Sequence, residues 1–271
     1  MPSPKFDKPE EFEKALKDYW EQEKTISIID KNLHKIEIDT VLSHLTPNDR
    51  IADIGCGCGD ATVRYAEKVK SVRAFERSDK LRSDAQENVA KAGAKNVTLE
   101  PGDVMTLTDV GETFDAVVSQ RMLINLPSWE AQQVGLNNIV KMLKPGGRLI
   151  MVENTDDAFA AMNDMRAKMG MGPVPQHWHN LFFDYDKLKP FMAKSFNTVK
   201  EYDFGLYYFL TRVYVPMFAS FVGFGANAVK DPIFEKSDAA ARELYEKLKD
   251  QVQFPKVRAL GPIQCFVYKK K

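Results

Sequence analysis

This chain of 271 residues has few cysteines, no net charge and no long apolar run. Of the three cysteines, Cys56 and Cys58 are separated by one residue, a spacing poorly suited to a disulfide. Without further cysteines or a nearby histidine, this pair also lacks the ligands of a zinc site. Cys265 stands alone. We therefore expect no structural disulfide, no metal and a reducing, cytoplasmic compartment.

The balance of charge excludes another class of partner. Lys plus Arg and Asp plus Glu each number 38, so the net charge is zero and the basic footprint of a nucleic-acid binder is missing. We expect a small-molecule partner and no nucleic acid. The first eleven residues have neither an apolar core nor an Arg-rich amphipathic pattern, so we expect no targeting peptide.

The longest uncharged run is also too short for a membrane helix. It covers residues 213–229, which are 17 residues and include Pro216. A spanning helix needs about 20 predominantly apolar residues. We expect no integral membrane segment.

Residues 51–59, Ile-Ala-Asp-Ile-Gly-Cys-Gly-Cys-Gly, are the most informative stretch that is present. An apolar strand runs into a turn with glycines at 55, 57 and 59, and a helix follows from Asp60. Glycines let the backbone turn sharply and bring its N–H groups close to a ligand. The spacing differs from the G-x-G-x-x-G of dinucleotide folds, and no Lys-Ser/Thr follows as in a P-loop. The pattern predicts nucleoside binding at this corner.

The following segments supply the rest of such a site. A strand at residues 71–76 ends in Glu76, seventeen residues after Gly59, where a carboxylate can accept hydrogen bonds from two ribose hydroxyls. A strand at 96–100 leads to Asp103, which is placed to read an adenine amino group. Further strands are predicted at 114–119 and 147–152, and helices at 60–69, 80–92 and 129–142. This alternation predicts a parallel sheet with helices on both faces.

Five segments that follow one another in the expected order resemble the motifs of class I S-adenosylmethionine-dependent methyltransferases, over about residues 45–153. They are Asp53 to Gly59, Glu76, Gly102 with Asp103, residues 114–118 and residues 143–147. The resemblance implies an α/β, Rossmann-like sheet of seven strands, of which strands six and seven form an antiparallel edge pair. It also implies S-adenosyl-L-methionine as cofactor and S-adenosyl-L-homocysteine as product. The implied cofactor-binding residues are Asp53, Gly55, Cys56, Gly57, Gly59, Glu76, Arg77, Asp103, Val104 and Gln120.

Two amphipathic helices are predicted before the sheet, at residues 9–23 and 27–44. By resemblance, such helices fold over the methyl donor and complete the acceptor pocket; alternatively, they pack on the outside of the sheet. Tyr19, His34 and Lys35 are weak site candidates on them. We predict three parts: 1–44, an N-terminal helical lid; 45–155, the S-adenosylmethionine-binding core; and 156–271, acceptor-side helices, a cap insertion and the last strands.

The third part carries the acceptor-specific candidates. A helix is predicted at 158–169, strands at 198–204 and 262–268, and a helix at 236–250 within the cap. Asp156 and Asp157 are adjacent carboxylates without a third ligand, so a helix N-terminus accounts for them better than a metal. The predicted acceptor-binding residues are Arg121, Asn125, Trp178, Asn180, Tyr207 and Arg212.

A Pro-rich and aromatic-rich loop at residues 171–186 holds two histidines that flank a tryptophan, His177 and His179. For an alcohol acceptor they are the first candidates for the base that removes the proton, and Glu153 is the second. For a carboxylate acceptor no base is needed; Arg121 or Arg212 would then orient the anion and the histidines would be structural.

Residues 178–184 and 121–129 show a narrower resemblance, to methyltransferases that accompany bacterial surface-polysaccharide genes. We therefore expect O-methylation of a sugar or polyol hydroxyl, as part of polysaccharide biosynthesis. The alternatives are N-methylation of an amino sugar or amine, and carboxyl methylation. A protein of another class, a catalytically silent S-adenosylmethionine-binding module, also fits the cofactor motifs.

Overall fold

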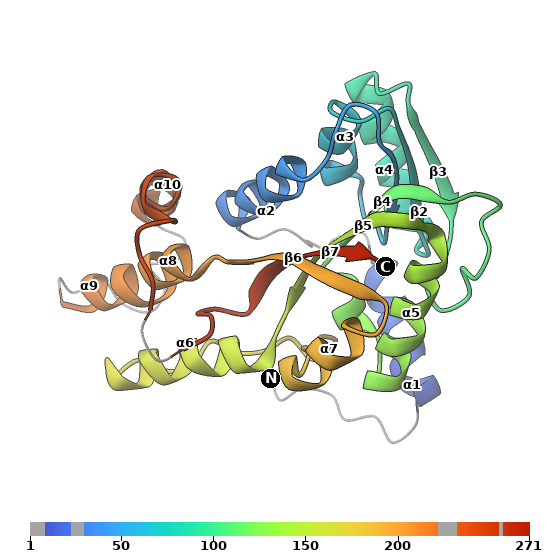
Figure 1. Ribbon diagram of the computed structural model, residues 1–271. Helices are drawn as coiled ribbons and strands as arrows, with labels where there is room; N and C mark the ends of the chain where they lie inside the picture. Colours follow the sequence, from blue (N-terminus) through green and yellow to red (C-terminus); the bar gives the residue numbers. More distant parts are fainter. Residues whose placement is uncertain (1–8, 23–29, 222–231, 255–256) are drawn as a thin grey trace.

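The strands of the chain form one mixed sheet in the order β3-β2-β1-β4-β5-β7-β6. The computed structural model describes residues 9–22, 30–221, 232–254 and 257–271 (Figure 1). The strands are β1 Arg50–Ile54, β2 Ser71–Glu76, β3 Val97–Pro101, β4 Phe114–Gln120, β5 Leu143–Asn154, β6 Phe196–Asp203 and β7 Ile263–Lys270. The predicted Rossmann-like fold is confirmed, because β1 to β5 are parallel and β7 pairs antiparallel with both β5 and β6.

The strand order places a ligand site at one edge of this sheet. From β1 the chain crosses to β2 on one side, whereas β4 lies on the other side of β1. At such a switch point the loops after the two central strands diverge and leave a crevice at the carboxyl ends of the strands. The glycine turn after β1 and the segment after β4 both lie at this crevice.

Helices cover both faces of the sheet. They are α1 Pro9–Trp20, α2 Lys31–Ser43, α3 Asp60–Ala66, α4 Asp79–Ala92, α5 Trp129–Met142, α6 Asp156–Lys168, α7 Tyr185–Met192, α8 Gly205–Tyr208, α9 Val215–Phe221 and α10 Pro232–Leu248. One apolar core joins the sheet to α2, α3, α6, α8 and α10, and a second joins its other face to α5 and α7. In Figure 1, α2 and α3 lie above the strands, and α5 and α7 lie below them.

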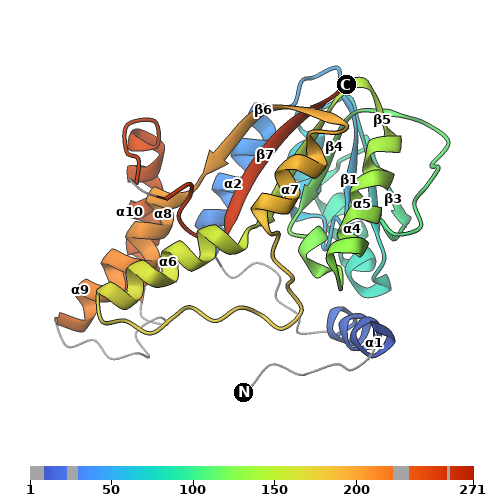
Figure 2. The same ribbon diagram turned by 60° about the horizontal axis from the view of Figure 1, so that its bottom comes forward.

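The segment between β6 and β7 forms the predicted cap. It contains α8, the π-helix η2 (Phe209–Tyr214), α9 and α10, which lie together beyond the end of β6. Figure 2 shows α6 running alongside this group, and η2 contacts both α6 and α10. A π-helical turn inside a helix is uncommon and is frequent at functional sites.

Local sequence explains where several elements begin and end. Ser128 caps α5 by accepting a hydrogen bond from the Ala131 amide at 3.2 Å, and Ser78 caps α4 through the Leu81 amide at 3.1 Å. The observed α5 therefore coincides with the predicted range, and α4 begins one residue before it.

Among the strands, β5 differs most from its predicted range of 147–152. β5 begins at Leu143, and the predicted turn at 143–147 lies inside the strand. Leu143 pairs with Phe114, but the next pair is Arg148 with Ala116, so the intervening residues form a bulge. The ends predicted for the first two helices, 23 and 27–29, lie outside the described residues.

The predicted boundary at residue 155 divides the sheet, because β6 and β7 come from residues 156–271 and hydrogen-bond to β5 or to each other. The division into three parts stays a prediction. Among the described helices, none combines the length and apolarity needed to cross a membrane.

We predict that Gly55→Ala destabilises the protein by about 2–4 kcal/mol in urea unfolding. Gly55 has φ +71°, and a Cβ atom there would lie 2.2 Å from Met122 Cγ. Gly111→Ala is the matched control, because Gly111 has φ +75° with no atom within 4 Å of the added Cβ. The control should lose only about 1 kcal/mol. Equal losses in the two variants would show that the contact with Met122 does not matter.

Candidate functional site

A cavity of about 420 Å³ lies at the carboxyl ends of β1, β2, β4 and β5, within the range of small-molecule sites. Residues of α1, α2, α6, the cap and the loop at 174–182 complete its wall. The cavity brings together most predicted site residues: Asp53, Gly55, Cys56, Gly57, Glu76, Arg77, Asp103, Val104, Gln120, Arg121, Asn125, His177, His179, Asn180 and Arg212.

The glycine turn is fastened to β2. The amides of Gly55 and Cys56 donate to the Phe75 carbonyl at 2.8 and 3.1 Å. The Gly57 amide donates to Glu76 Oε2 at 2.9 Å. The sequence predicted that the N–H groups of the glycines approach a ligand, and those of Gly55 and Gly57 are instead engaged within the protein. Gly57 has φ +56° and no atom within 4 Å of an added Cβ, so its exposed side faces open space in the cavity.

Glu76 ends β2 with its carboxylate in the cavity wall. Besides the Gly57 amide it accepts the Ser78 amide at 2.8 Å on Oε1. Burial raises the pKa of Glu76, and these two backbone donors partly oppose that shift. Each oxygen retains a further lone pair, so the carboxylate can accept two more hydrogen bonds.

Asp53, the second buried acid of this edge, lies next to the glycine turn at the end of β1. Thr62 donates its hydroxyl to Asp53 Oδ2 at 2.6 Å. Burial raises the pKa of Asp53 to about 7 despite this hydrogen bond, and the nearby charge of Glu76 adds to the rise. A cationic ligand beside Asp53 would favour its charged form.

A buried polar network joins α2 to the end of β4. Glu37 is fully buried, accepts a hydrogen bond from Gln120 Nε2 at 2.5 Å and lies 3.5 Å from Arg121 Nε. Burial alone would raise the pKa of Glu37, but the charge of Arg121 and hydrogen bonds from His34 and Gln120 lower it. His34 also bonds Asp60 at 3.1 Å. Both ring nitrogens of His34 therefore have protein partners.

Arg121 has an unusual backbone for a cavity residue. Its φ is +53°, the only positive value among the described non-glycine residues. Its amide donates to the Val152 carbonyl at 2.7 Å, and its own carbonyl accepts from Asn125 Nδ2 at 2.9 Å. Such conformations are unfavourable and cluster at functional sites.

The loop after α6 brings the predicted histidines to the cavity. His179 is buried, stacks on His177 with ring centroids 5.5 Å apart, and lies 4.7 Å from the ring of Tyr19. Burial lowers the pKa of His179 to about 4, and the neighbouring His177 contributes to that shift. His179 is therefore neutral and weakly basic near pH 7, whereas His177 is exposed on the cavity rim.

Arg212 reaches the cavity from the π-helix η2. Its guanidinium binds Asp30 Oδ2 at 2.5 Å. Asp30 is also the N-cap of α2, and its Oδ1 accepts a hydrogen bond from the Tyr207 hydroxyl at 2.8 Å. Tyr207, a predicted acceptor-binding residue, is fully buried and reaches the site only through Asp30.

Three further predicted residues do not line the cavity. Glu153 is fully buried, and its carboxylate accepts the Ser119 hydroxyl and the amides of residues 122–124 at 3.0 to 3.4 Å. Burial raises the pKa of Glu153 to about 7, and these donors oppose the shift. Gly59 caps α3 and packs against Ala85, and Trp178 packs against Phe12 and Tyr19. The buried position of Glu153 and its hydrogen bonds to the backbone give it a structural role and no access to a ligand in the cavity.

Several cavity residues were not predicted from the sequence, notably Asp30, Asp60, Asn154, Phe159 and Tyr208. Asp60 and Asn154 carried a usable signal, because Asp60 directly follows the glycine turn and Asn154 is the last residue of β5 at the ligand edge. The others reach the cavity only through the packing of helices distant in sequence. Of the weak candidates, Tyr19 and His34 line the cavity, whereas Lys35 pairs with Asp39 on the exposed side of α2.

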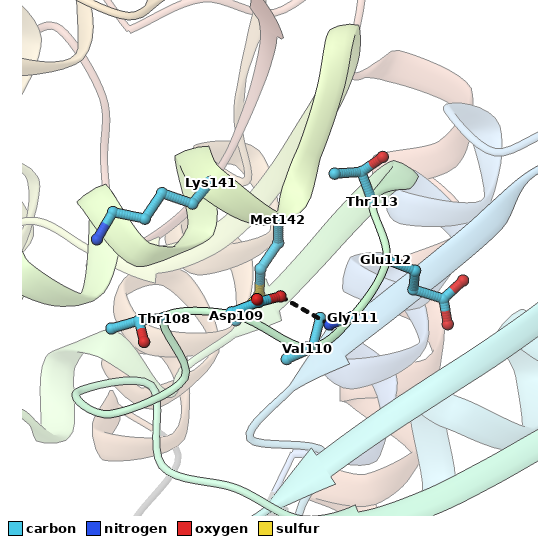
Figure 3. Close-up of a pocket in the computed structure, with 8 residues that line it drawn as sticks. All are labelled: Thr108, Asp109, Val110, Gly111, Glu112, Thr113, Lys141 and Met142. Carbon is cyan, nitrogen blue, oxygen red and sulfur yellow. Dashed lines mark hydrogen bonds between the residues drawn. The ribbon is translucent and has the colours of Figure 1, made fainter.

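A second hollow, of about 310 Å³, lies at the opposite edge of the sheet (Figure 3). The loop 108–113 before β4 and the end of α5 line it, and Figure 3 shows Asp109 turned back onto the Gly111 amide. None of the predicted site residues contributes to it. Across the described ranges, no three His, Cys, Asp or Glu side chains are grouped as a metal site would require.

Comparison with known sequences agrees with this geometry. A family profile described as a methyltransferase domain matches residues 51–147. Demethylmenaquinone methyltransferase of Symbiobacterium thermophilum is 33% identical over 115 residues, which are 41% of this chain and 45% of that protein. A probable cobalt-precorrin-6B C(15)-methyltransferase of Methanothermobacter thermautotrophicus is 32% identical over 124 residues, 44% of this chain and 61% of the relative. The chain spans about half the length of the first of these relatives.

Solved structures share the fold at low identity. N-methyltransferase NodS of Bradyrhizobium japonicum, in complex with S-adenosyl-L-homocysteine, has a TM-score of 0.56 and 13% identity over 96% of this chain and 98% of that chain. The [4+2]-cyclase SpnF has a TM-score of 0.56 and 21% identity over 93% of this chain and 86% of that chain. These likenesses concern the fold alone.

We predict that the ligand-free protein loses stability as the pH rises from about 4 to about 7, in part through Asp53. Its pKa is raised from 3.8 to about 7, so folding favours the protonated form, and that contribution is lost as the pH rises through the folded-state pKa. Asp53→Asn should remove up to about 1.4 kcal/mol per pH unit of this slope, measured by urea unfolding at several pH values.

Asp250→Asn, at an exposed carboxyl group at the end of α10, is the control and should keep the parent slope. A parent slope that persists unchanged in Asp53→Asn would contradict the raised pKa.

Proposed function

We propose that the chain is an S-adenosylmethionine-dependent methyltransferase that acts on a small molecule. The observation that carries the proposal is the hydrogen bond from the Gly57 amide to Glu76, which holds the glycine turn against the end of β2. Both residues lie inside the segment that matches a methyltransferase domain. The open space beside Gly57 gives a nucleoside room to approach the backbone.

The charges of the cavity suit this cofactor. Five acids line it, namely Asp30, Asp53, Asp60, Glu76 and Asp103, and they outnumber the three arginines of the same wall, Arg77, Arg121 and Arg212. This excess of acids favours a ligand that carries a sulfonium and an ammonium group. We propose that Glu76 accepts the ribose hydroxyls, Asp103 and Val104 hold the adenine, and Asp53 and Gln120 face the methionine part. When bound, the cofactor supplies an electrophilic methyl group.

The protein then has to align the acceptor and exclude water. In the proposed reaction the acceptor oxygen forms a bond to the methyl carbon as the carbon–sulfur bond breaks, and the hydroxyl proton passes to a base. Between the two histidines we favour His177 for that base, because the lowered pKa of His179 makes it a weaker proton acceptor. Glu153 is not proposed, since its oxygens hold the backbone after β4.

We propose a sugar or polyol hydroxyl as the methyl acceptor, in line with the O-methylation expected from the sequence. The names of the two relatives described above concern menaquinone and cobalt-precorrin, so a role in polysaccharide biosynthesis rests on the motif resemblance alone. Methylation of an amine is the second candidate. It is favoured by the acidic cavity, because an amine is attracted as its cation before it loses a proton.

Labelled methyl transfer into fractionated cell extract tests the function directly, with the products followed by mass. Label in a small-molecule fraction supports the proposal, and label only in protein or nucleic acid contradicts the small-molecule assignment. Because the same fold also serves a [4+2]-cyclase, donor binding without transfer to any fraction would favour a silent or non-methylating protein.

We predict that Glu76→Gln weakens S-adenosylhomocysteine binding by about tenfold to a hundredfold in calorimetry, because charge-assisted hydrogen bonds contribute about 1.5–3 kcal/mol. Glu246→Gln, at an exposed pair with Lys249 on α10, is the control and should bind as the parent does. Unchanged affinity in Glu76→Gln would remove Glu76 from the cofactor site.

We predict that His177→Gln lowers kcat by about 10²-fold or more while the Kd for the donor stays unchanged, as for loss of a general base. His179→Gln should lower kcat less. If His177→Gln turns over at the parent rate and the dependence of the rate on pH is unaltered, His177 is not the base.

A further inference from the structure

Three polar atoms in the cavity wall have no hydrogen-bond partner within the described part of the chain. They are Asn125 Oδ1, Asn154 Oδ1 and His179 Nδ1. Asn154 and His179 are each 6% exposed, and the buried atoms are shielded from bulk water. Buried polar groups are nearly always satisfied in folded proteins, so unsatisfied atoms beside a cavity point to a ligand that supplies the missing partners.

The fold gathers these three residues at one place. Asn125 follows β4 and Asn154 ends β5, and these strands are neighbours in the sheet. The loop that carries His179 runs beside both, because the Leu181 amide donates to the Ile124 carbonyl at 2.6 Å and the Phe183 amide donates to the Asn154 carbonyl at 2.9 Å. The three side chains therefore belong to one part of the wall.

Two of the three atoms, the carboxamide oxygens of Asn125 and Asn154, are hydrogen-bond acceptors. The Asn125 amide is fixed in orientation because its Nδ2 donates to the Arg121 carbonyl at 2.9 Å, which leaves Oδ1 as an acceptor. Asn154 presents a carboxamide oxygen, and Nδ1 of the neutral His179 ring accepts or donates a hydrogen bond according to the tautomer. A carboxylate acceptor molecule would bring only lone pairs and leave the two carboxamide oxygens unsatisfied, whereas a hydroxyl group can donate to these oxygens and bond either form of the imidazole.

Apolar side chains complete this part of the wall. Phe159 and Phe182 pack edge to face with centroids 5.2 Å apart, and both line the cavity together with Tyr208. Aromatic faces and edges suit the flat or apolar face of a ring.

We propose that the methyl acceptor is a ring compound with two or more hydroxyl groups, which donates hydrogen bonds to Asn154 and Asn125, forms a hydrogen bond with His179 and packs against Phe159 and Phe182. This inference rests on the proposed function and names the class of its substrate. One hydroxyl is the nucleophile, and a neighbouring hydroxyl holds the ring through Asn154.

The test measures probe binding to the protein saturated with S-adenosylhomocysteine, by calorimetry or ligand-observed NMR. The probes are catechol and myo-inositol, which carry neighbouring hydroxyls, together with benzoate and benzylamine. Catechol or myo-inositol should bind more tightly than benzoate and benzylamine. Asn154→Leu should weaken the hydroxylated probe by about tenfold, as for loss of one hydrogen bond, and leave benzoate unchanged.

Asn197→Leu is the matched control, because Asn197 is exposed on β6 and lies outside the cavity. It should bind every probe as the parent does. Asn125→Leu gives a second variant with the same expectation as Asn154→Leu if the latter does not fold. Preference for catechol over myo-inositol, or the reverse, distinguishes a phenolic ring from a sugar-like ring.

The outcomes separate the inference from the function on which it rests. If the parent does not bind S-adenosylhomocysteine, the proposed function fails first. If it does bind, then tighter binding of benzoate or benzylamine, no binding of either hydroxylated probe, or an unchanged affinity in both Asn variants overturns the substrate class and leaves the methyltransferase proposal intact.

Discussion

The hydrogen bond from the Gly57 amide to the Glu76 carboxylate is the contact on which the site depends. It joins the turn after β1 to the end of β2 at 2.9 Å, between two neighbouring parallel strands. The carboxylate is buried, and its raised pKa reflects the desolvation that this position imposes. Backbone donors from Gly57 and Ser78 compensate part of that penalty while the remaining lone pairs stay directed at the cavity. The same interaction thus shapes the turn and holds the Glu76 carboxylate in the cavity wall.

A second constraint acts at the end of β4, where a buried acid organises the neighbouring polar side chains. Glu37 on α2 holds Gln120 and approaches Arg121, whose backbone adopts a positive φ. Removing one partner from such a network leaves a buried charge unsatisfied, which is strongly destabilising. Helix α2 is therefore tied to the end of β4, where Gln120 and the following Arg121 line the cavity. The lid predicted from the sequence has a physical connection to the site through this network.

The alternation of a β-strand separates two neighbouring residues at the end of β5. Glu153 and Asn154 are consecutive there, and consecutive strand residues point to opposite faces. Glu153 was a candidate from the sequence, whereas Asn154 was not predicted. In the fold, Glu153 turns to the backbone of residues 122–124, and Asn154 lines the cavity. His177 and His179 were both predicted, and only the structure shows that burial, with the neighbouring His177, lowers the pKa of His179.

The sequence by itself determined the parallel core, the glycine turn and the acid at the end of β2, because apolar periodicity, glycine spacing and capping residues such as Ser128 act within a few residues. It also indicated an antiparallel edge pair and an inserted cap through resemblance. Only the tertiary structure decided that Glu37, Asp60 and His34 share one network, that Asp30 meets Arg212 across 182 residues, and that Asn125, Asn154 and His179 present unsatisfied atoms together. These contacts join residues distant in sequence, and no local propensity specifies which buried polar groups will face one another when the helices pack.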